Sequence, residues 1–493
     1  MGRRDALLRL SIMAALLLGG AMAPVFAADV KNLSVTVSSG TQANAYGGYT
    51  IEEGASALQN ALTLSGPAKV LGASAGGWSR WGNAEWNTLT IRLDEDGLLG
   101  PSDIVGGGVA ESEGGGAAVH NTVYIESGTV EGTVEGGVAV GINGVGDGTG
   151  DVLSNQVTMS GGTVHSVFGG ETGEGNANDN VVTIKGSAAV TGKSNAVYGG
   201  YTIDGNASGN IVNIEDDADI HGEIMGGYTR AGSLISGNKV NVTGGNVNEN
   251  TVYGVYTAYG DVLDNQAVIK GTGQAGSSDT NSVYAGFTNI GAAAGNILYI
   301  QDSAEIAGSA FAGYQGGFIS SETVERNQVF MSGGSVGGDL TGGGSNNGGE
   351  TLNNYVEITG GTVSGNVYSG FTDSADALEN TLTVAGGRVE GSLFGGYSNT
   401  GTANENKLTF SAGTAGSDAY GGYAQEGADG NEAVLSGTSV LEGNAAGGSS
   451  ARGEASGNSL TIKENSEVKG DAAGGDVYMG TISKNIITIQ YNA

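Results

Sequence analysis

One stretch of sequence decides the fold: Asn380-Thr-Leu-Thr-Val-Ala-Gly-Gly-Arg-Val-Glu-Gly-Ser-Leu-Phe-Gly-Gly-Tyr-Ser-Asn-Thr-Gly-Thr-Ala-Asn-Glu405. Residues 381–384 alternate between polar and apolar side chains, which is the period of a half-buried strand. Gly386 and Gly387 then permit a turn with positive φ. From Val389 to Tyr397 every second residue is apolar or glycine, so this segment predicts a second strand with both end residues on one side. The polar residues after Tyr397 close the unit as a loop.

This unit recurs along the chain, with an Asn before each first strand. From Asn60 to Asn485 the mean spacing is roughly 28 residues. One unit cannot bury its apolar side alone, but stacked units bury it and pair each strand in parallel with its copy. An Asn at a coil corner tolerates the left-handed conformation, and its amide can bond to the Asn of the next coil. The predicted Asn corners are Asn60, Asn87, Asn121, Asn155, Asn180, Asn210, Asn238, Asn265, Asn296, Asn327, Asn354, Asn380, Asn406, Asn431, Asn458 and Asn485.

The sequence therefore predicts an all-β chain that folds as a right-handed parallel β-helix, or β-solenoid, of about 16 coils. A β-propeller is the main alternative, but the period is short for a four-stranded blade and the number of units is too large. We expect irregular coils or a cap in residues 28–150 and regular repeats in residues 151–493.

The first 27 residues have the pattern of a signal peptide. Arg3, Arg4 and Arg9 form a basic region, and residues 10–22 form an apolar run that is too short to span a bilayer. We predict cleavage after Ala27 and export by the general secretory route; an uncleaved anchor is the alternative. The mature chain is therefore expected outside the cell or at its surface.

Composition limits the partners. The formal net charge is −32, which argues against nucleic acid and anionic lipid as partners, because both are polyanions. The chain has no cysteine, so its stability must come from burial and backbone pairing rather than from disulfides. No segment after the signal peptide reaches 18 consecutive apolar residues.

The phrases with an aromatic residue, Gly-Gly and a second aromatic residue, such as Tyr198-Gly-Gly-Tyr201-Thr202, resemble the passenger region of autotransporters of Gram-negative bacteria. The resemblance covers nearly all of residues 28–493 and implies a β-helical passenger displayed outside the outer membrane, often as an adhesin. That family also carries a C-terminal β-barrel, and no barrel pattern follows the repeats in this sequence. We therefore expect a passenger portion, attached to the outer membrane only through a barrel that this chain does not contain.

Residues for catalysis are sparse. Of the three histidines, His165 and His221 lie where other units place Glu or Ser, which indicates a solvated turn. The acidic runs at residues 94–96 and 215–219 put neighbouring carboxylates on opposite sides of a strand, so they read as a solvated acidic surface. Gly146–Asp151 is an isolated acidic loop and weak evidence for Ca²⁺. We predict no catalytic, cofactor-binding or metal-binding residue, and no cofactor.

Aromatic residues are the better candidates for a ligand site. Each Gly-Gly phrase has two aromatic positions three residues apart, and stacking of the repeats aligns these positions in two rows. In an extended strand, residues three apart face opposite sides. If the second row enters the core, the first row lies on the surface as a platform for sugar rings or partner side chains. The alternative is that Gly-Gly bends the chain and both rows stack as a structural ladder. The three tryptophans lie within nine residues and form either a second platform or an N-terminal cap. The predicted platform residues are Tyr46, Tyr198, Tyr253, Tyr284, Phe311, Tyr368, Phe394, Tyr420, Trp78, Trp81 and Trp86.

Three functions follow from these patterns. The favoured hypothesis is a non-catalytic adhesin or binding rod whose partners are host or microbial glycans or surface proteins. The second is a β-helical enzyme acting on polysaccharides, and the third is a structural component of a surface coat.

Overall fold

The structure, a computed structural model, describes residues 29–101, 104–111, 115–141, 148–193, 196–248, 250–276, 283–317, 321–346 and 348–490. The predicted signal peptide and the loop residues Gly146 and Asp147 lie outside this part of the chain. The described residues contain strands and no helix, and they form a parallel β-solenoid of about 16 coils, as predicted. They belong to two compact units. Unit 1 comprises residues up to Gly222 and Gly227–Thr229, and unit 2 comprises Glu223–Gly226 and the residues from Arg230 onward.

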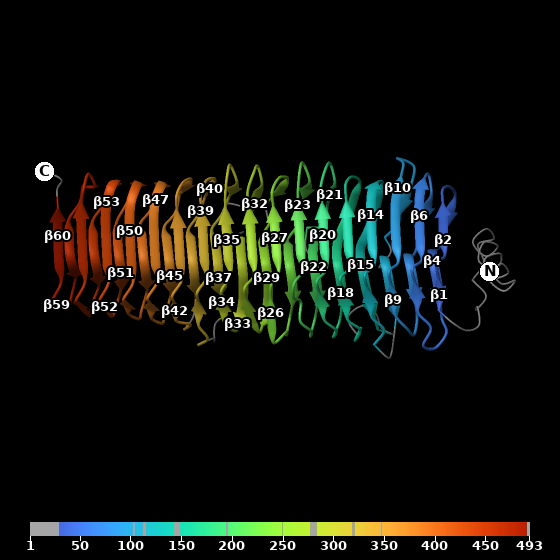
Figure 1. The fold of residues 1–493 in the computed structure, drawn as a ribbon, viewed down its shortest axis with the longest axis horizontal. Coiled ribbons are helices and arrows are strands. Elements are labelled where there is room, and N and C mark those ends of the chain that lie inside the picture. The colour runs from blue at the N-terminus through green and yellow to red at the C-terminus, as the bar shows by residue number, and fades with distance from the viewer. Residues whose placement is uncertain are drawn as a thin grey trace. The chain divides into compact units, whose positions relative to one another are not determined.

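The coils are built from up to four extended segments, and in some coils a short segment is absent or continuous with a longer strand. Equivalent strands lie side by side along each unit (Figure 1). The first segment follows the corner Asn and comprises, in unit 1, β2 (Ser34–Val37), β6 (Ala61–Gly66), β10 (Thr88–Leu93), β14 (Thr122–Ser127), β17 (Gln156–Met159), β20 (Val181–Ile184) and β23 (Ile211–Ile214). In unit 2 it comprises β27 (Lys239–Val242), β31 (Gln266–Ile269), β35 (Ile297–Ile300), β39 (Gln328–Met331), β43 (Tyr355–Ile358), β47 (Thr381–Val389), β50 (Lys407–Ala415), β53 (Glu432–Leu441), β56 (Ser459–Lys463) and β60 (Ile486–Gln490).

The third segment carries the Gly-Gly pair. In unit 1 it comprises β4 (Ala45–Thr50), β8 (Ser74–Ser79), β12 (Val105–Glu111), β15 (Thr129–Val140), β18 (Thr163–Thr172) and β22 (Val197–Thr202), and β25 (Ile224–Thr229) has residues in both units. In unit 2 it comprises β29 (Val252–Tyr259), β33 (Val283–Ile290), β37 (Ala310–Gln315), β41 (Leu340–Ser345), β45 (Val367–Thr372), β48 (Leu393–Ser398), β51 (Ala419–Ala424), β54 (Ala445–Ser450) and β58 (Ala472–Val477).

Short strands connect the first segment of a coil with the Gly-Gly segment, and the Gly-Gly segment with the next corner Asn. Those after the first turn are β3 (Thr41–Gln42), β7 (Lys69–Val70), β11 (Leu98–Leu99), β21 (Ala189–Val190) and β24 (Asp219–Ile220) in unit 1, and β28 (Asn246–Asn248), β32 (Gln274–Gly276), β36 (Glu305–Ile306), β40 (Ser335–Val336), β44 (Thr362–Val363) and β57 (Glu467–Val468) in unit 2. Those before the corner Asn are β1 (Val30–Lys31), β5 (Ala57–Leu58), β9 (Ala84–Glu85), β13 (Ala118–Val119), β16 (Val152–Leu153) and β19 (Ala177–Asn178) in unit 1, and β26 (Leu234–Ser236), β30 (Asp261–Leu263), β34 (Ala293–Ala294), β38 (Val324–Glu325), β42 (Thr351–Leu352), β46 (Ala377–Leu378), β49 (Ala403–Asn404), β52 (Gly427–Asp429), β55 (Glu454–Ser456) and β59 (Thr481–Ser483) in unit 2.

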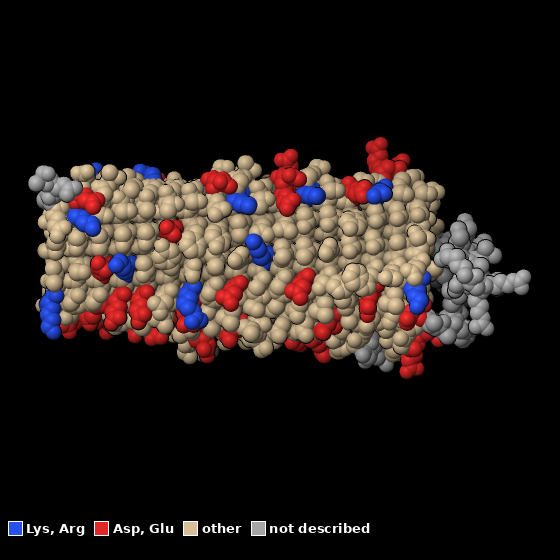
Figure 2. All heavy atoms as spheres, in the orientation of Figure 1, with Lys and Arg blue, Asp and Glu red and all other residues tan. Residues whose placement is uncertain are grey.

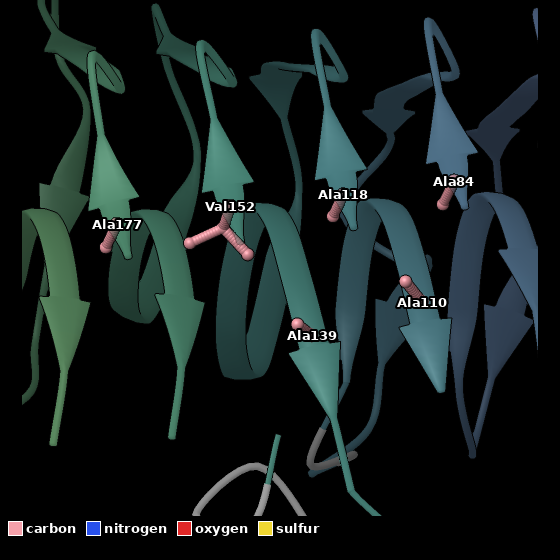
Figure 3. Packing of buried hydrophobic residues seen from close by; sticks show 6 residues of the cluster. All are labelled: Ala84, Ala110, Ala118, Ala139, Val152 and Ala177. Carbon is pink, nitrogen blue, oxygen red and sulfur yellow. The ribbon is translucent and has the colours of Figure 1, made fainter. Parts of the chain in front are cut away.

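Within each unit, the described coils pair in parallel with the equivalent strands of the neighbouring coils. β47 pairs with β50 so that Leu382 lies opposite Leu408 and Val384 opposite Phe410. All four side chains point inward and are at most 1% exposed. At the short strands the core is narrow and small side chains fill it: in unit 1, Ala84, Ala110, Ala118, Ala139, Val152 and Ala177 pack together (Figure 3).

The corner Asn side chains form a buried hydrogen-bonded ladder in each unit. The Oδ1 atom of Asn380 accepts from the backbone N–H of Asn354 at 3.0 Å and from its Nδ2 at 2.9 Å. In turn, the Nδ2 of Asn380 donates to Oδ1 of Asn406 and to the backbone oxygen of Thr351 in β42. The same contacts run from Asn60 to Asn180 in unit 1 and from Asn265 to Asn431 in unit 2. Each coil therefore supplies the acceptor that the previous coil needs.

The left-handed conformation lies one residue before the position that the sequence indicated. The φ angle is 55° at Glu379, 55° at Asn353 and 58° at Glu405, whereas the corner Asn residues do not have positive φ. The preceding residue turns the chain, and this turn directs the Asn side chain inward to the ladder. The prediction that the Asn itself would be left-handed is wrong for this reason.

The second glycine pair of each repeat interrupts the in–out alternation of the strand, while neighbouring coils stay in register through it. We call this interruption the bulge, and it corrects the predicted side of Tyr397. Cβ atoms added to Gly395 and Gly396 would overlap the backbone of Lys407 and the side chain of Asn406, respectively, so both glycines face inward. Two consecutive inward residues shift the alternation by one. Leu393 consequently points into the core at 0% exposure, while Tyr397 lies on the outer side.

We expect Asn380→Ala to destabilise the protein by about 2–5 kcal/mol, because the N–H and amide of Asn354 lose a shared acceptor in a dry interior, at roughly 1–3 kcal/mol for each unsatisfied group. Chemical denaturation followed by circular dichroism measures this change. The exposed Asn465 provides the control, and Asn465→Ala should leave stability nearly unchanged; equal losses in the two variants would contradict the role of the ladder.

We expect Gly396→Ala to destabilise the protein by several kcal/mol or to prevent folding, because the new methyl group would overlap the buried side chain of Asn406. In the control Gly427→Ala the nearest atom lies 3.5 Å from the added Cβ, so this change should be tolerated. Thermal unfolding of both variants checks the prediction, and a stable Gly396→Ala protein would disprove the close approach.

Candidate functional site

The outward aromatic side chains beside the bulge form what we call the aromatic stripe of each unit. In unit 1 it contains Tyr46, Tyr49, Trp78, Phe168, Tyr198, Tyr201 and Tyr228, and in unit 2 it contains Tyr253, Tyr256, Tyr284, Phe287, Phe311, Tyr314, Tyr368, Phe371, Phe394, Tyr397, Tyr420 and Tyr423.

The two rows of the stripe lie side by side. Within one coil, the ring centroids of Phe394 and Tyr397 are 5.1 Å apart with an interplanar angle of 77°. Between coils, Phe394 stacks on Tyr368 at 5.0 Å and 5°, and on Tyr420 at 5.7 Å and 21°. Rings on opposite faces of a strand could not approach in this way, so the bulge has brought both rows to the outer side.

Neighbouring rings cover the rings of the stripe, by stacking on Phe394 and by edge-on contacts with Tyr198. Phe394 is only 8% exposed and Tyr198 only 1%, although both belong to the outer side. A sugar ring packs against an open aromatic face, and rings within the stack offer little of it. The stripe therefore has the geometry of a structural ladder in which both aromatic rows stack, but this ladder lies outside the core and not within it.

Carboxylates and amides border the stripe. The indole Nε1 of Trp78 donates to Oε2 of Glu111 at 3.2 Å, and the hydroxyl of Tyr420 donates to Oδ2 of Asp418 at 3.1 Å. Burial, then the neighbouring Tyr49 and Glu111, raises the pKa of Tyr46, and burial, then Asp418, raises that of Tyr420. Both hydroxyls therefore stay protonated at neutral pH, and that of Tyr420 donates to Asp418. On the face shown in Figure 2, acidic side chains gather toward the edges and few charges lie in the middle.

Two carboxylic acids replace aromatic residues in the stripe of unit 1, and the sequence reasoning missed them. Glu135 lies opposite Phe168 in the register of β15 and β18, and Glu171 lies opposite Tyr201 in that of β18 and β22. Burial raises the pKa of Glu171 to about 7, and the neighbouring carboxyl group of Glu135 opposes this rise in pKa. An alignment of the Gly-Gly phrases would have found them, because Glu135-Gly-Gly-Val and Phe-Gly-Gly-Glu171 put an acid in the aromatic positions.

The three tryptophans lie at separate places in the coil. Trp78 belongs to the stripe, and its ring meets Tyr46 edge-on at 5.4 Å. Trp81 lies in the following turn, with the guanidinium of Arg80 5.8 Å from its ring centroid. Trp86 lies at the corner before Asn87. The described ring contacts do not join the three, so they do not form one platform.

Trp86 is the most exposed of the aromatic candidates. Its side chain is 56% exposed and stacks on the imidazole of His120 at 4.2 Å and 26°. Its φ of 57° is unfavourable for a bulky residue. Other coils of unit 1 place Gln59, Ser154 and Asp179 at the same corner, so the fold accepts a small or polar side chain there. The corner thus does not require a tryptophan.

The remaining histidines and acidic runs show no converging chemistry. His165 is exposed on β18, and His221 pairs with Asp219 at 2.9 Å on an exposed surface. Asp94 and Asp96 lie in an exposed turn, and Asp216 accepts a hydrogen bond from the backbone of Gly186. Within the described ranges, no three His, Asp or Glu side chains are placed to hold a metal ion.

No family model, curated protein or solved structure significantly matches this chain. The part of the chain that the structure describes contains no helix long and apolar enough to cross a membrane.

We expect Phe394→Ala to destabilise the protein by about 3–5 kcal/mol, because the ring is nearly buried among four others: Tyr368, Tyr397, Tyr420 and Tyr423. In the control Tyr259→Ala the ring is 55% exposed, so the loss should be below about 1 kcal/mol. Denaturant titration separates the two, and a loss for Phe394→Ala no greater than that of the control would show that the stripe does not stabilise the coil.

Proposed function

We propose that this protein is an exported, non-catalytic binding protein whose solenoid displays ligand-contact residues on its outer corners. The observation that carries the proposal is the exposed Trp86 stacked on His120. A large aromatic ring in an unfavourable backbone conformation, at a corner where a polar residue suffices, is accounted for by contact with a partner.

The proposed ligand is a glycan at a host or microbial surface. His120 covers one side of the indole, and the exposed part of the ring, with Trp86 56% exposed, is available for contact with the apolar face of a sugar. The net charge of −32 disfavours polyanionic ligands, so a neutral or cationic glycan fits better than an acidic one. The stripe then acts mainly as a stabilising ladder.

Export and surface display rest on the sequence. The basic and apolar pattern of residues 1–27 supports secretion, and the likeness of the Gly-Gly phrases to autotransporter passengers supports display as an adhesin. Both belong to the proposal.

A polysaccharide-active enzyme is the second candidate, and the neighbouring carboxyl groups of Glu135 and Glu171 are the observation in its favour. Glycoside hydrolysis needs two carboxyl groups that reach the scissile bond. Glu135 is only 1% exposed, and β12, β15, β18 and β22 contain no Lys or Arg, so the geometry favours binding over catalysis.

A glycan array probed with the full chain tests the proposal. We expect binding to neutral or cationic glycans and a loss of about fivefold or more in affinity for Trp86→Ala, since losing one stacked ring costs roughly 1 kcal/mol or more. Tyr124→Ala is the matched control, because that ring is also exposed, at 44%, and should leave binding unchanged.

Unchanged binding in Trp86→Ala would refute Trp86 as the contact. Sustained release of reducing ends from a polysaccharide, abolished by Glu171→Gln, would establish the enzyme instead. Absence of glycan binding together with ordered self-assembly would favour a coat component.

A further inference from the structure

Trp86 and His120 occupy the same corner of two successive coils of unit 1. Both have a left-handed backbone, with φ of 57° and 56°. The N–H of Trp86 donates to the backbone oxygen of Val119 at 3.0 Å, so the two corners are joined directly. Immediately after the corners, Nδ2 of Asn87 donates to Oδ1 of Asn121 at 3.0 Å in the buried ladder. The backbone therefore holds the two side chains at a fixed separation, and their rings stack at 4.2 Å.

The stack with His120 restrains the indole of Trp86. A side chain that is 56% exposed otherwise keeps much of its rotamer freedom, and a ligand that binds to it has to remove that freedom. The flanking corners supply Gln59 on one side and Ser154 on the other, and neither has a ring. The ring of His120 thus orients the indole before a ligand arrives.

His120 also brings to the site a group that changes its charge. An imidazole is the side chain that ordinarily gains a proton as the pH falls from about 8 to about 5. An imidazolium is attracted to the face of an indole, so protonation preserves the stack. What changes is the charge beside the exposed indole. A neutral sugar is little affected by that charge, whereas a cationic sugar is repelled.

Around this corner the described strands carry few other titratable groups. β9 carries Glu85, the turn before β16 carries Asp151, and the strands that follow the corner carry Arg92, Tyr124 and Glu126. Arg92 and Glu126 form an ion pair at 2.7 Å, and this hydrogen bond lowers the pKa of Glu126 and raises that of Arg92. Carboxyl groups ordinarily lose their proton below about pH 5, and Tyr and Arg keep theirs beyond about pH 8. The imidazole is therefore the group expected to change charge between these limits.

We propose that His120 positions the indole of Trp86 for a glycan and sets the preference of the site for the charge of that glycan. The inference rests on the proposed function and adds a specificity to the same site. With a neutral imidazole the site binds neutral and cationic sugars alike. With an imidazolium it still binds neutral sugars and binds cationic sugars more weakly.

Isothermal titration of the full chain with two oligosaccharide probes tests the proposal. One probe is a short, neutral oligomer of N-acetylglucosamine. The other is the same oligomer with a trimethylammonium group in place of each acetamido group, so that its charge does not depend on pH. From about pH 8 to about pH 5.5 the affinity of the wild type for the cationic oligomer should fall about fivefold, the effect of one unit charge about 4 Å away in water. The affinity for the neutral oligomer should stay constant.

Two variants of His120 separate its ring from its charge. His120→Gln places at this corner the residue type that Gln59 supplies at the equivalent corner, and it removes both ring and charge. Its affinity for the neutral oligomer should fall about threefold because the indole loses its restraint, and its affinity for the cationic oligomer should not change with pH. His120→Phe restores a ring without a titrating proton, so it should recover most of the lost affinity, again without pH dependence. His165→Gln is the control and should behave as the wild type.

Equal affinity of the wild type for the cationic oligomer at both pH values, or the same fall in His120→Phe, would overturn the charge preference. An unchanged affinity of His120→Gln for the neutral oligomer would show that His120 does not position the indole. If Trp86→Ala still weakens binding in either case, the proposed function stands without this inference. Binding of neither oligomer by the wild type would overturn the inference whatever a glycan array shows.

Discussion

The structure depends on the inward-pointing side-chain amide of the corner Asn, whose hydrogen bonds can be completed only by the adjacent coils. The side chain of Asn380 is fully buried, and its donors and acceptor are used by residues of the adjacent coils. A buried amide without partners is costly, so a coil gains its stability only with a neighbour in register. The apolar positions obey the same rule. Ile487 and Ile489 lie opposite Leu460 and Ile462, yet they are 44% and 50% exposed because no described coil covers them.

The amide ladder also dictates the Gly-Gly pair and, through it, the aromatic stripe. The strand that crosses the ladder approaches it so closely that neither glycine can bear a side chain, as at Gly395 and Gly396. Both glycines turn inward, and the residues on either side of the pair both point outward. Two rings per coil then stack at about the distance between coils, as between Tyr253 and Tyr284 at 5.2 Å. The rings stabilise the outer side of strands whose inner side is mostly backbone.

Residues that depart from the repeat are the best candidates for a function, because the stability of the stacked coils accounts for the residues at the regular positions. Trp86 stands where other coils have polar corner residues, and it is exposed. Glu135 and Glu171 stand where other coils have rings or small side chains, and they are buried or partly buried. The first departure provides an accessible surface for a partner. In the second departure Glu135 is buried and provides no such surface.

The sequence by itself determined the class of fold, the parallel stacking and the corner at which each Asn lies. It could do so because contacts between coils join equivalent positions, so a pattern along the chain encodes a tertiary contact. Only the tertiary structure decided which side Tyr397 faces, because the bulge arises from the approach of Asn406 and Lys407. It also decided that the residue before each Asn is left-handed, that the three tryptophans lie apart, and that Glu135 meets Glu171. Those outcomes depend on the path of the backbone between coils, which residue spacing does not specify.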